Sequence, residues 1–304
     1  MYFDNETFSS NHSGPLNIAT FRLPLQDENE SVTLAKLVES LHDSGLALLD
    51  CTNPVDRQTP LWSHQNASTE VQNFITKIAT ELDGLEKGLE DGLEHEKNQF
   101  VWDVTPNPNK EAIERAHFAT PRSHDDREFY MHTDGAYRRD PPKYFALYCI
   151  HSDKMGGGQS KLVNGDGIVK KLNQLTGGSA ILNHLKDASW DVKVPYGSMK
   201  NNSNTHVLDK PVLKIVKSTE HSHHHLWSFR RDIMIPRSLE QEHVLQVLDQ
   251  LLESPENQFV GTLPDGFMLI IDNSRWFHGR GRILDKRRFL KRIRFLGLKE
   301  KNTF

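Results

Sequence analysis

The chain has few cysteines and no long hydrophobic run. Its 304 residues include two cysteines, Cys51 and Cys149. Two cysteines do not build the disulfide framework of a small secreted domain, and they cannot fill a zinc site made of thiolates. No stretch approaches the roughly 18 consecutive apolar residues that a membrane-spanning helix requires. We therefore expect a soluble protein that is located in the cytoplasm and makes no contact with a membrane.

An excess of positive charge is also missing. The formal net charge is −4, so the chain as a whole offers no basic field for nucleic acid. The N-terminus has neither the basic start nor the apolar core of a signal peptide. With 36% hydrophobic residues the chain can bury a sizeable core. We expect a single domain over residues 1–304, in which residues 1–16 are loose.

Hydrophobic periodicity predicts three helices, at 31–44, from residue 68 to about 82, and at 238–254. The first two belong to a helical cover over residues 31–100, and the third opens with a capping box at Ser238 and Gln241. The remaining pattern consists of short strand-like runs separated by turn residues. These runs lie at 143–150, 160–165, 190–195, 211–217, 225–229, 232–236, 266–272 and 291–298. The pattern predicts a mainly β fold with flanking helices, a double-stranded β-helix (jelly roll) over 130–298 with a helical insert at 238–254.

Three H-x-D pairs could supply metal ligands: His124/Asp126, His132/Asp134 and His151/Asp153. A non-haem iron(II) site for oxygen chemistry uses two histidines and one carboxylate, and it leaves further coordination positions open. Such a site needs an H-x-D pair and a distant histidine. The segment "DGFMLIIDNSRWFHGR" (265–280) would deliver His278 at the end of a buried strand. The first pair lies in the charged stretch "RSHDDREF", which we expect to be a solvated loop.

Four motifs occur in an order that resembles a known family. They are "HTDG" (132–135), "GGGQS" (156–160), "DNSRWFHGR" (272–280) and "RRFLKRIR" (287–294). Together they resemble the taurine dioxygenase and clavaminate synthase-like branch of the iron(II)/2-oxoglutarate oxygenases, and the glutarate hydroxylases of the same superfamily. The resemblance covers roughly residues 130–298. It implies iron(II), 2-oxoglutarate and O₂ as cofactors and cosubstrates, with the metal held by His132, Asp134 and His278.

The order of the motifs selects one H-x-D pair. In the family, the paired glycines follow the strand that comes after H-x-D. Gly157 lies 23 residues after Asp134, which leaves room for that strand. It lies only four residues after Asp153, which leaves none.

The arginines of 287–294 suit a dicarboxylate, because a guanidinium pairs with a carboxylate in a bidentate manner and stays charged. The resemblance implies that Arg288 binds 2-oxoglutarate and Arg292 binds an acidic group of the substrate. The alternative gives 2-oxoglutarate to Arg292, with Arg294 helping to bind the substrate. Ser160, after the paired glycines, would donate a hydrogen bond to a 2-oxoglutarate carboxylate, unless it only caps a strand edge.

Two further residues are candidates for the substrate side. In relatives the region around Arg230 faces the substrate, although a surface ion pair is an equal alternative. Tyr137 could line the same pocket or be an ordinary buried aromatic. The histidine run at 221–225 suggests a metal site, but we interpret it as surface, since histidines so close on one strand cannot easily close a tetrahedron.

The resemblance implies a 2-oxoglutarate-dependent dioxygenase that hydroxylates or otherwise oxidises a C–H bond of a small acidic substrate, such as an amino acid or a short carboxylic acid. Succinate and CO₂ would be released. The alternative is a zinc-dependent hydrolase, or a non-catalytic metal-binding protein, with the same jelly roll and ligands. Such a protein has no need for an arginine-rich strand beside the metal. The identity of the substrate and the oligomeric state stay open, and nucleic acid is not an expected partner.

Overall fold

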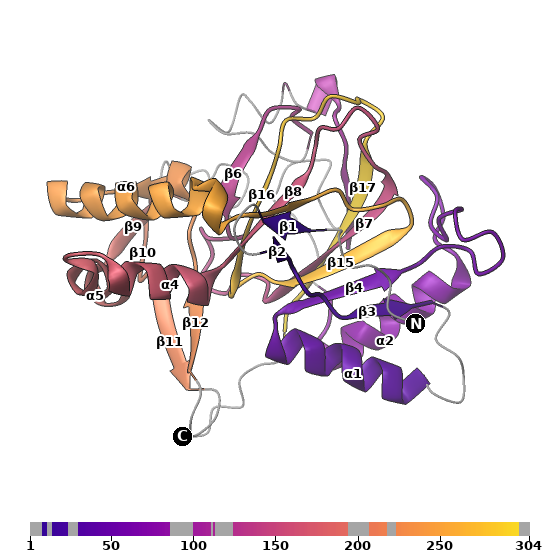
Figure 1. Ribbon diagram of the computed structural model, residues 1–304, viewed down its shortest axis with the longest axis horizontal. Coiled ribbons are helices and arrows are strands. Elements are labelled where there is room, and N and C mark those ends of the chain that lie inside the picture. Colours follow the sequence, from indigo (N-terminus) through magenta and orange to yellow (C-terminus); the bar gives the residue numbers. More distant parts are fainter. Residues whose placement is uncertain are drawn as a thin grey trace.

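Two six-stranded sheets form the centre of the protein (Figure 1). The structure is a computed structural model, and it describes residues 8–10, 14–23, 30–85, 100–110, 112, 124–193, 207–217 and 223–297. In spatial order, the first sheet contains β3 (Thr20–Arg22), β4 (Leu46–Asp50), β15 (Phe267–Asp272), β7 (Tyr144–His151), β17 (Phe289–Phe295) and β5 (Val101–Val104). The second contains β2 (Gly14–Pro15), β1 (Ser9–Ser10), β14 (Phe259–Gly261), β8 (Ser160–Asn164), β16 (Trp276–Arg280) and β6 (Phe129–His132).

The first sheet is antiparallel except for the pairing of β3 with β4. Its outer face is covered by α1 (Glu30–Asp43) and α2 (Thr69–Glu81), as Figure 1 shows. Val71, Phe74 and Ile78 of α2 pack in one cluster with Ile270 of β15 and Phe295 of β17. The sequence periodicity of the two helices places these apolar side chains on one face, and the sheet buries that face.

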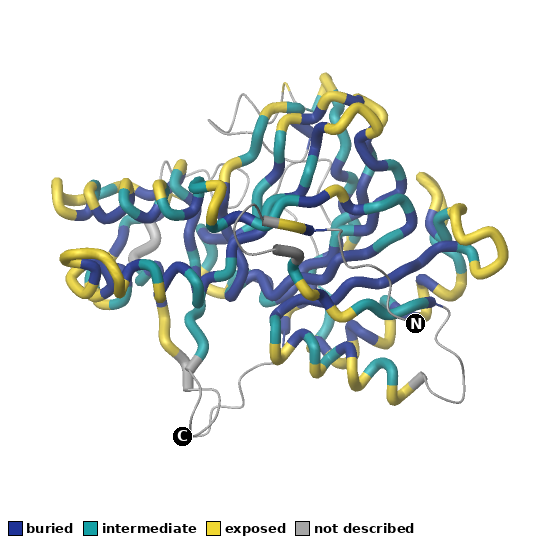
Figure 2. Tube along the Cα trace, in the orientation of Figure 1, coloured by how far each residue is buried: buried dark blue, intermediate teal, exposed yellow. Residues whose placement is uncertain are grey.

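The inner faces of the two sheets enclose a second hydrophobic cluster. Phe145, Leu269 and Leu290 come from the first sheet, whereas Leu162 and Trp276 come from the second. Figure 2 shows dark-blue, buried chain along the central strands and exposed chain at the loops and the outer sides of the helices. The metal-ligand candidates lie where strands of the two sheets meet.

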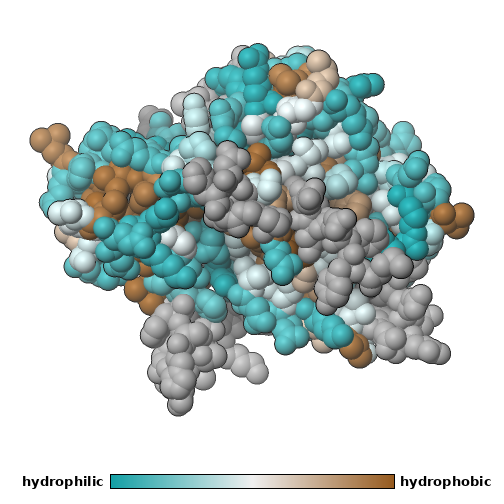
Figure 3. Space-filling model, in the orientation of Figure 1, coloured by the Kyte–Doolittle hydropathy of each residue, from teal (hydrophilic) through white to brown (hydrophobic). Residues whose placement is uncertain are grey.

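An insertion between β8 and β14 forms a separate layer of helices and short strands beside the second sheet (Figure 1). It consists of α4 (Gly165–Gln174), α5 (Gly178–Asp187), β9 (Trp190–Lys193), β10 (Val207–Lys210), β11 (Leu213–Lys217), β12 (His223–Trp227), β13 (Met234–Ile235) and α6 (Leu239–Glu253). The predicted cap of α6 is present, since Ser238 Oγ accepts a hydrogen bond from the Gln241 amide at 3.1 Å. Figure 3 shows a mainly hydrophilic face with a hydrophobic patch near α5 and α6.

The structure corrects the sequence prediction in this insertion. Helices α4 and α5 were not expected, because glycines at both their N-termini obscure the helical pattern. The run 232–236 begins in a 3₁₀ turn (Arg231–Ile233) and continues in the two residues of β13. Its three consecutive apolar residues are too few to distinguish a strand from another structure by periodicity.

The expectation that residues 1–16 are loose is wrong for the part of this segment that the structure describes. Ser9 pairs with Val260 of β14, and the Leu16 amide donates to the Phe8 carbonyl at 2.8 Å. The Phe8 side chain is 1% exposed, so burial of this ring holds the segment in place. None of the described helices is long and apolar enough to cross a membrane.

Candidate active site

Two strands of the second sheet bring the ligand candidates together. His278 of β16 is the register partner of His132 of β6, and Asp134 follows β6 by two residues. Asp134 Oδ1 lies 3.7 Å from His132 Nε2 and 3.8 Å from His278 Nε2. One ligand atom of each of the three residues lies within 4.8 Å of the others. Ligands held about 2.1 Å from a metal are roughly 3 Å apart when adjacent in an octahedron, so small side-chain shifts would close such a site.

The protonation state of His132 suits a metal ligand. Its Nδ1 lies 2.8 Å from the Tyr130 carbonyl oxygen, to which a protonated Nδ1 donates, leaving the Nε2 lone pair directed at the site. Burial, together with the nearby His278, lowers the pKa of His132 to about 4, so the ring is neutral at pH 7. The His278 ring packs on Phe145, with centroids 4.4 Å apart.

The main chain of Asp134 is held by Asn273, which sequence reasoning missed. Asn273 lies in the turn between β15 and β16 and is 1% exposed. Its Oδ1 accepts from the Asp134 amide at 2.7 Å, and its Nδ2 donates to the carbonyls of Asp134 at 2.9 Å and Pro142 at 2.8 Å. The turn that leads into the strand of His278 thus also fixes the backbone of the carboxylate ligand. The polar corner "DNS" before a histidine was the available signal.

Arg292 and Arg294 face the second oxygen of the Asp134 carboxylate. Arg294 reaches Asp134 Oδ2 through Nε at 3.1 Å and Nη2 at 3.0 Å, and Arg292 Nη1 lies 3.6 Å from the same oxygen. Burial alone would raise the pKa of Asp134, but the two guanidinium groups and hydrogen bonds from His132 and His278 hold it well below its usual range. The carboxylate is therefore ionised, with one oxygen toward the histidines and the other toward the arginines.

Trp102 on β5 is a second residue that sequence reasoning missed. The guanidinium carbons of Arg292 and Arg294 lie 5.7 and 5.0 Å from the centroid of its ring, within the range of cation–π attraction. The ring is 2% exposed, and its indole N–H has no hydrogen-bond partner among the described residues. No motif marks this tryptophan. Only the pairing of β5 with β17 places it opposite Arg292.

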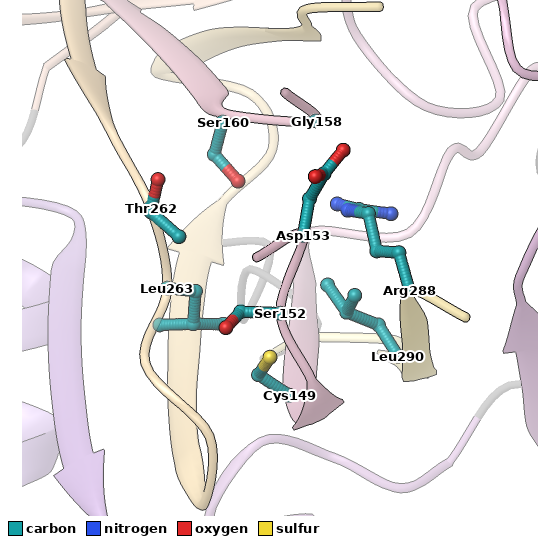
Figure 4. Close-up of a pocket in the computed structure, with 9 residues that line it drawn as sticks. All are labelled: Cys149, Ser152, Asp153, Gly158, Ser160, Thr262, Leu263, Arg288 and Leu290. Carbon is teal, nitrogen blue, oxygen red and sulfur yellow. The ribbon is translucent and has the colours of Figure 1, made fainter. Parts of the chain in front are cut away.

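Arg288 occupies a different place from the other two arginines. It is 4% exposed and lines a small cavity with Ser160 and Gly158 (Figure 4). Its Nη1 is buried and has no hydrogen-bond partner in the described part of the chain. Burial lowers the pKa of Arg288 to about 10, which still leaves it charged at pH 7. A buried cation without a direct counter-ion is costly and suits a site that awaits an anion.

Glycine is required beside this arginine. A Cβ at Gly158 would lie 2.7 Å from Arg288 Cδ, and the residue has φ of +61°. Both the close approach and the left-handed backbone exclude larger side chains. The glycine-rich motif therefore makes room for the guanidinium.

The cavity beside Arg288 lies a short way from the metal-ligand candidates. On β8, Ser160 is two residues from Leu162, the register partner of His278, which is about 7 Å of strand. The cavity has a volume of about 10 Å³, enough for one water-sized group such as a carboxylate oxygen. A short dicarboxylate could thus place one end here and the other at the metal. Ser160 is itself 7% exposed.

Of the two remaining substrate candidates, Arg230 lies near the site. It is 6% exposed, its guanidinium carbon is 5.3 Å from the ring centroid of Phe129, and it pairs with Asp232 at 2.7 Å. The ion pair predicted as the alternative is therefore present, but it is buried rather than on the surface. Tyr137 is half-buried and packs beside a small cluster that contains Val192, which favours its interpretation as an ordinary aromatic.

The described part of the histidine run, residues 223–225, lies on β12, which forms a hairpin with β11. His225 on β12 pairs with Asp166 in the first turn of α4, with Nδ1 and Oδ1 2.6 Å apart. Among the described residues, His132, Asp134 and His278 lie close enough together to hold a metal ion. No such group includes the described histidines of this run. His221 lies outside the described residues.

The expectation of a solvated loop around His124 is wrong. His124 is 2% exposed and Asp125 is 1% exposed. The Arg280 guanidinium donates to the carbonyls of Asp125 at 2.7 Å and Arg127 at 2.6 Å. His124 and Asp125 are buried beside backbone carbonyls that accept hydrogen bonds from an inward-pointing arginine of β16, whereas Arg127 is exposed.

The pair His151/Asp153 has a structural role instead. The Asp153 carboxylate accepts hydrogen bonds from the amides of Met155 at 2.9 Å and Leu284 at 2.7 Å. These bonds fix the turn that carries the glycine motif. Asp153 is therefore occupied by backbone donors, in line with its rejection as a metal ligand on spacing.

Comparisons with known proteins agree with this geometry. The family model described as "Taurine catabolism dioxygenase TauD, TfdA family" matches residues 33–294. Among solved structures, an asparagine oxygenase complex with Fe(II), 2S,3S-3-hydroxyasparagine and succinate has a TM-score of 0.64 at 16% identity, covering 87% of this chain and 79% of that one. The non-haem iron oxygenase OrfP with Fe and alpha-ketoglutaric acid has a TM-score of 0.60 at 14% identity, covering 92% and 94%.

A further OrfP complex, with Fe, succinate and (3S)-hydroxy-L-Arg, has a TM-score of 0.61 at 12% identity and covers 89% of this chain and 81% of that one. No curated protein matches. Identities this low show a shared fold, whereas the family match extends over most of the chain. The chain therefore belongs to the taurine catabolism dioxygenase TauD, TfdA family, and it is a 2-oxoglutarate-dependent dioxygenase.

Proposed function

We propose that the protein oxidises an unactivated C–H bond of a small acidic substrate, such as an amino acid, with iron(II), 2-oxoglutarate and O₂. The observation that carries this proposal is the convergence of His132, Asp134 and His278 near a buried arginine, Arg288, whose Nη1 has no hydrogen-bond partner among the described residues. When bound, iron(II) and 2-oxoglutarate supply with O₂ an oxidant that removes a substrate hydrogen and returns hydroxyl, and the cosubstrate leaves as succinate and CO₂. We further propose that the two sheets form the double-stranded β-helix of a single oxygenase domain.

The metal would be held by His132 Nε2, His278 Nε2 and Asp134 Oδ1. The donor set is two imidazole nitrogens and one carboxylate, which suits iron(II) and leaves further coordination positions open. Asn273 keeps the Asp134 backbone in place, and Arg294 holds the second carboxylate oxygen. With Oδ2 engaged, Asp134 would bind the metal through one oxygen.

Between the two assignments of the cosubstrate arginine, we favour Arg288. Its free Nη1 and the neighbouring Ser160 hydroxyl would bind the distal carboxylate of 2-oxoglutarate. Arg292 instead lies near Asp134 Oδ2, on the metal side of the strand. The apolar Leu290 lies between them in sequence and lines the same small cavity.

The substrate would bind on the side of Arg292, Arg294 and Trp102. Two guanidinium groups and an indole N–H offer several donors next to the metal, which suits a carboxylate or another acidic group. Arg230, which precedes the 3₁₀ turn Arg231–Ile233 and lies near Phe129 of β6, is a further candidate. The likeness to structures that contain hydroxylated asparagine or arginine supports an amino acid as the first class to test.

A turnover screen tests the proposal. Iron-loaded protein is supplied with 2-oxoglutarate, air and single members of a panel of amino acids and short carboxylic acids, and succinate is measured beside the oxidised product. We expect at least one acid to raise succinate formation in equal amount to product. The variant His278→Ala should lose this activity, whereas His225→Ala, in the hairpin outside the site, should retain it.

Two outcomes would contradict the proposal. One is the absence of 2-oxoglutarate consumption with iron(II) while zinc(II) supports hydrolysis of an ester or amide. The other is unchanged turnover in His278→Ala. The first result would favour the zinc hydrolase alternative, and the second would remove His278 from the metal site.

A further inference from the structure

A second and much larger cavity lies outside the metal site. Its volume is about 1010 Å³, and none of its described lining residues is a metal-ligand candidate or Arg288. Its described walls come from residues 139–143 after the metal-ligand loop, from residues 210–214 and 226–228 of the insertion, and from residues 296–297 after β17. Asp83 and Ser274 complete the described lining. A space of this size can enclose a small organic molecule.

Positive side chains exceed negative ones in this lining. The described charged residues are Arg139, Lys143, Lys210 and Lys214 against Asp83 and Asp140. The excess is two positive charges over the described lining. An anion entering the cavity would therefore meet a favourable potential.

Lys210 is the most buried of these cations and lacks a carboxylate partner in the described chain. Its Nζ donates to the Arg138 carbonyl at 2.9 Å and to Ser228 Oγ at 2.5 Å, both of them neutral oxygens. An ammonium group has three donors, so one is left for a ligand. Burial, with repulsion from Lys214, lowers the pKa of Lys210 to about 8, which leaves most of it charged at pH 7.

Apart from Ser228 and Ser274, the remaining described lining is apolar. It consists of Pro141, Pro142, Pro211, Val212, Leu226, Trp227 and Leu296, with Gly297. Trp227 and Val212 are each 2% exposed, so the accessible apolar surface comes mainly from proline rings and from Leu226 and Leu296. An aromatic or aliphatic body can be buried against these side chains. Inorganic phosphate alone would leave these surfaces unused.

We propose that this cavity is a second binding site, distinct from the metal centre, for a small organic carboxylate with an aromatic body. The carboxylate would pair with Lys210, since Lys143 already lies 3.9 Å from Asp272 Oδ2, and the ring would lie against Pro211 and Leu226. This proposal does not depend on the reaction proposed above, since none of the groups that it uses touches the metal ligands' side chains in the contacts described for them. Asn273 Nδ2 and the Pro142 carbonyl nevertheless link the cavity wall to the Asp134 loop.

Calorimetric titration with 3-phenylpropionate tests the site. The iron-loaded protein is kept without oxygen and titrated in the presence and absence of saturating 2-oxoglutarate. We expect a one-to-one complex with the same affinity in both conditions. The neutral 3-phenylpropanol and the ringless propionate should each bind about tenfold more weakly, because the first lacks the charge and the second the apolar body.

Variants separate this cavity from the catalytic one. Lys210→Met should weaken binding of 3-phenylpropionate about fivefold or more, the size expected for a partly buried charge-assisted hydrogen bond. Lys170→Met, an exposed lysine of α4, should leave binding unchanged. Circular dichroism and 2-oxoglutarate affinity report whether each variant is folded.

Several results would overturn the proposal. They are no binding by the parent protein, equal binding of 3-phenylpropanol or inorganic phosphate, and competition by 2-oxoglutarate. A folded Lys210→Met that binds normally would also overturn it. Loss of binding in Arg292→Met but not in Lys210→Met would place the probe at the metal centre.

Discussion

Arg288→Met removes a buried guanidinium and leaves an apolar side chain of similar reach. If Arg288 binds the distal carboxylate of 2-oxoglutarate, the variant leaves that carboxylate unpaired in a cavity of about 10 Å³, which has no room for a full hydration shell. Breaking a buried ion pair from one side costs about 3–5 kcal/mol, so we expect 2-oxoglutarate to bind roughly 100-fold to a few thousand-fold more weakly.

In the protein without 2-oxoglutarate, the same substitution should maintain or raise the stability of the fold. Burial lowers the pKa of Arg288 to about 10, which means that the folded state disfavours the charged form. At pH 7 the charged side chain therefore reduces the free energy of unfolding, by up to about 3 kcal/mol from the size of the lowered pKa. Arg288→Met should accordingly melt at a temperature equal to or above that of the parent.

The 2-oxoglutarate affinity, the thermal stability and a control variant at the neighbouring Arg287 test both expectations. Calorimetry of the iron-loaded protein without oxygen gives the 2-oxoglutarate affinity, and thermal unfolding without ligand gives the stability. Arg287→Met is the matched control, because Arg287 is exposed and pairs with Asp285 at 2.9 Å. It should change neither quantity appreciably. Affinity of Arg288→Met within about threefold of the parent would refute the reasoning, and loss in Arg292→Met instead would reverse the two arginine roles.

Three further predictions concern neighbouring groups. Asn273→Ala should weaken iron(II) binding about tenfold or more, because Asn273 holds the backbone of a metal ligand. Asn257→Ala is the control, since it loses a similar hydrogen bond to a carbonyl in the insertion and should not change iron(II) affinity. Equal metal affinities of the two variants would contradict the role of Asn273. Trp102→Phe keeps an aromatic ring but removes the N–H that has no partner among the described residues. The KM for an accepted substrate should therefore rise while 2-oxoglutarate affinity stays constant, and an unchanged KM would exclude a substrate contact. The affinity for 3-phenylpropionate should fall as pH rises through about 8, because Lys210 then loses its proton while the surrounding acids Asp83 and Asp140 stay charged. An affinity that calorimetry finds constant from pH 7 to 9 would contradict this.

The ligand set could be predicted from the sequence because it depends on short motifs. An H-x-D pair, a distant histidine after a buried strand and an arginine-rich strand are visible without knowledge of the fold. With the order of motifs that the family resemblance implies, the spacing to Gly157 favoured Asp134 over Asp153, and the charged surroundings of His124 set the first pair aside. The structure brings together the side chains so chosen.

Other parts of the site depend on tertiary register. Whether Arg288 or Arg292 faces the small cavity is decided by the pairing of β17 with β7, which shifts between Phe289 and Leu290. Trp102 contributes only because β5 joins the far edge of the same sheet. The burial of His124 could not be predicted from composition either. The neighbouring backbone accepts a hydrogen bond from the inward-pointing Arg280, and no local sequence pattern marks such a contact.

Diffraction from crystals grown without oxygen, with iron(II) and 2-oxoglutarate, tests the central claim most directly. Anomalous scattering at the iron edge should give one strong peak bounded by His132 Nε2, His278 Nε2 and Asp134 Oδ1, and the far carboxylate of 2-oxoglutarate should lie against Arg288 and Ser160. A peak elsewhere, or 2-oxoglutarate bound with Arg288 still unpaired, would contradict the account.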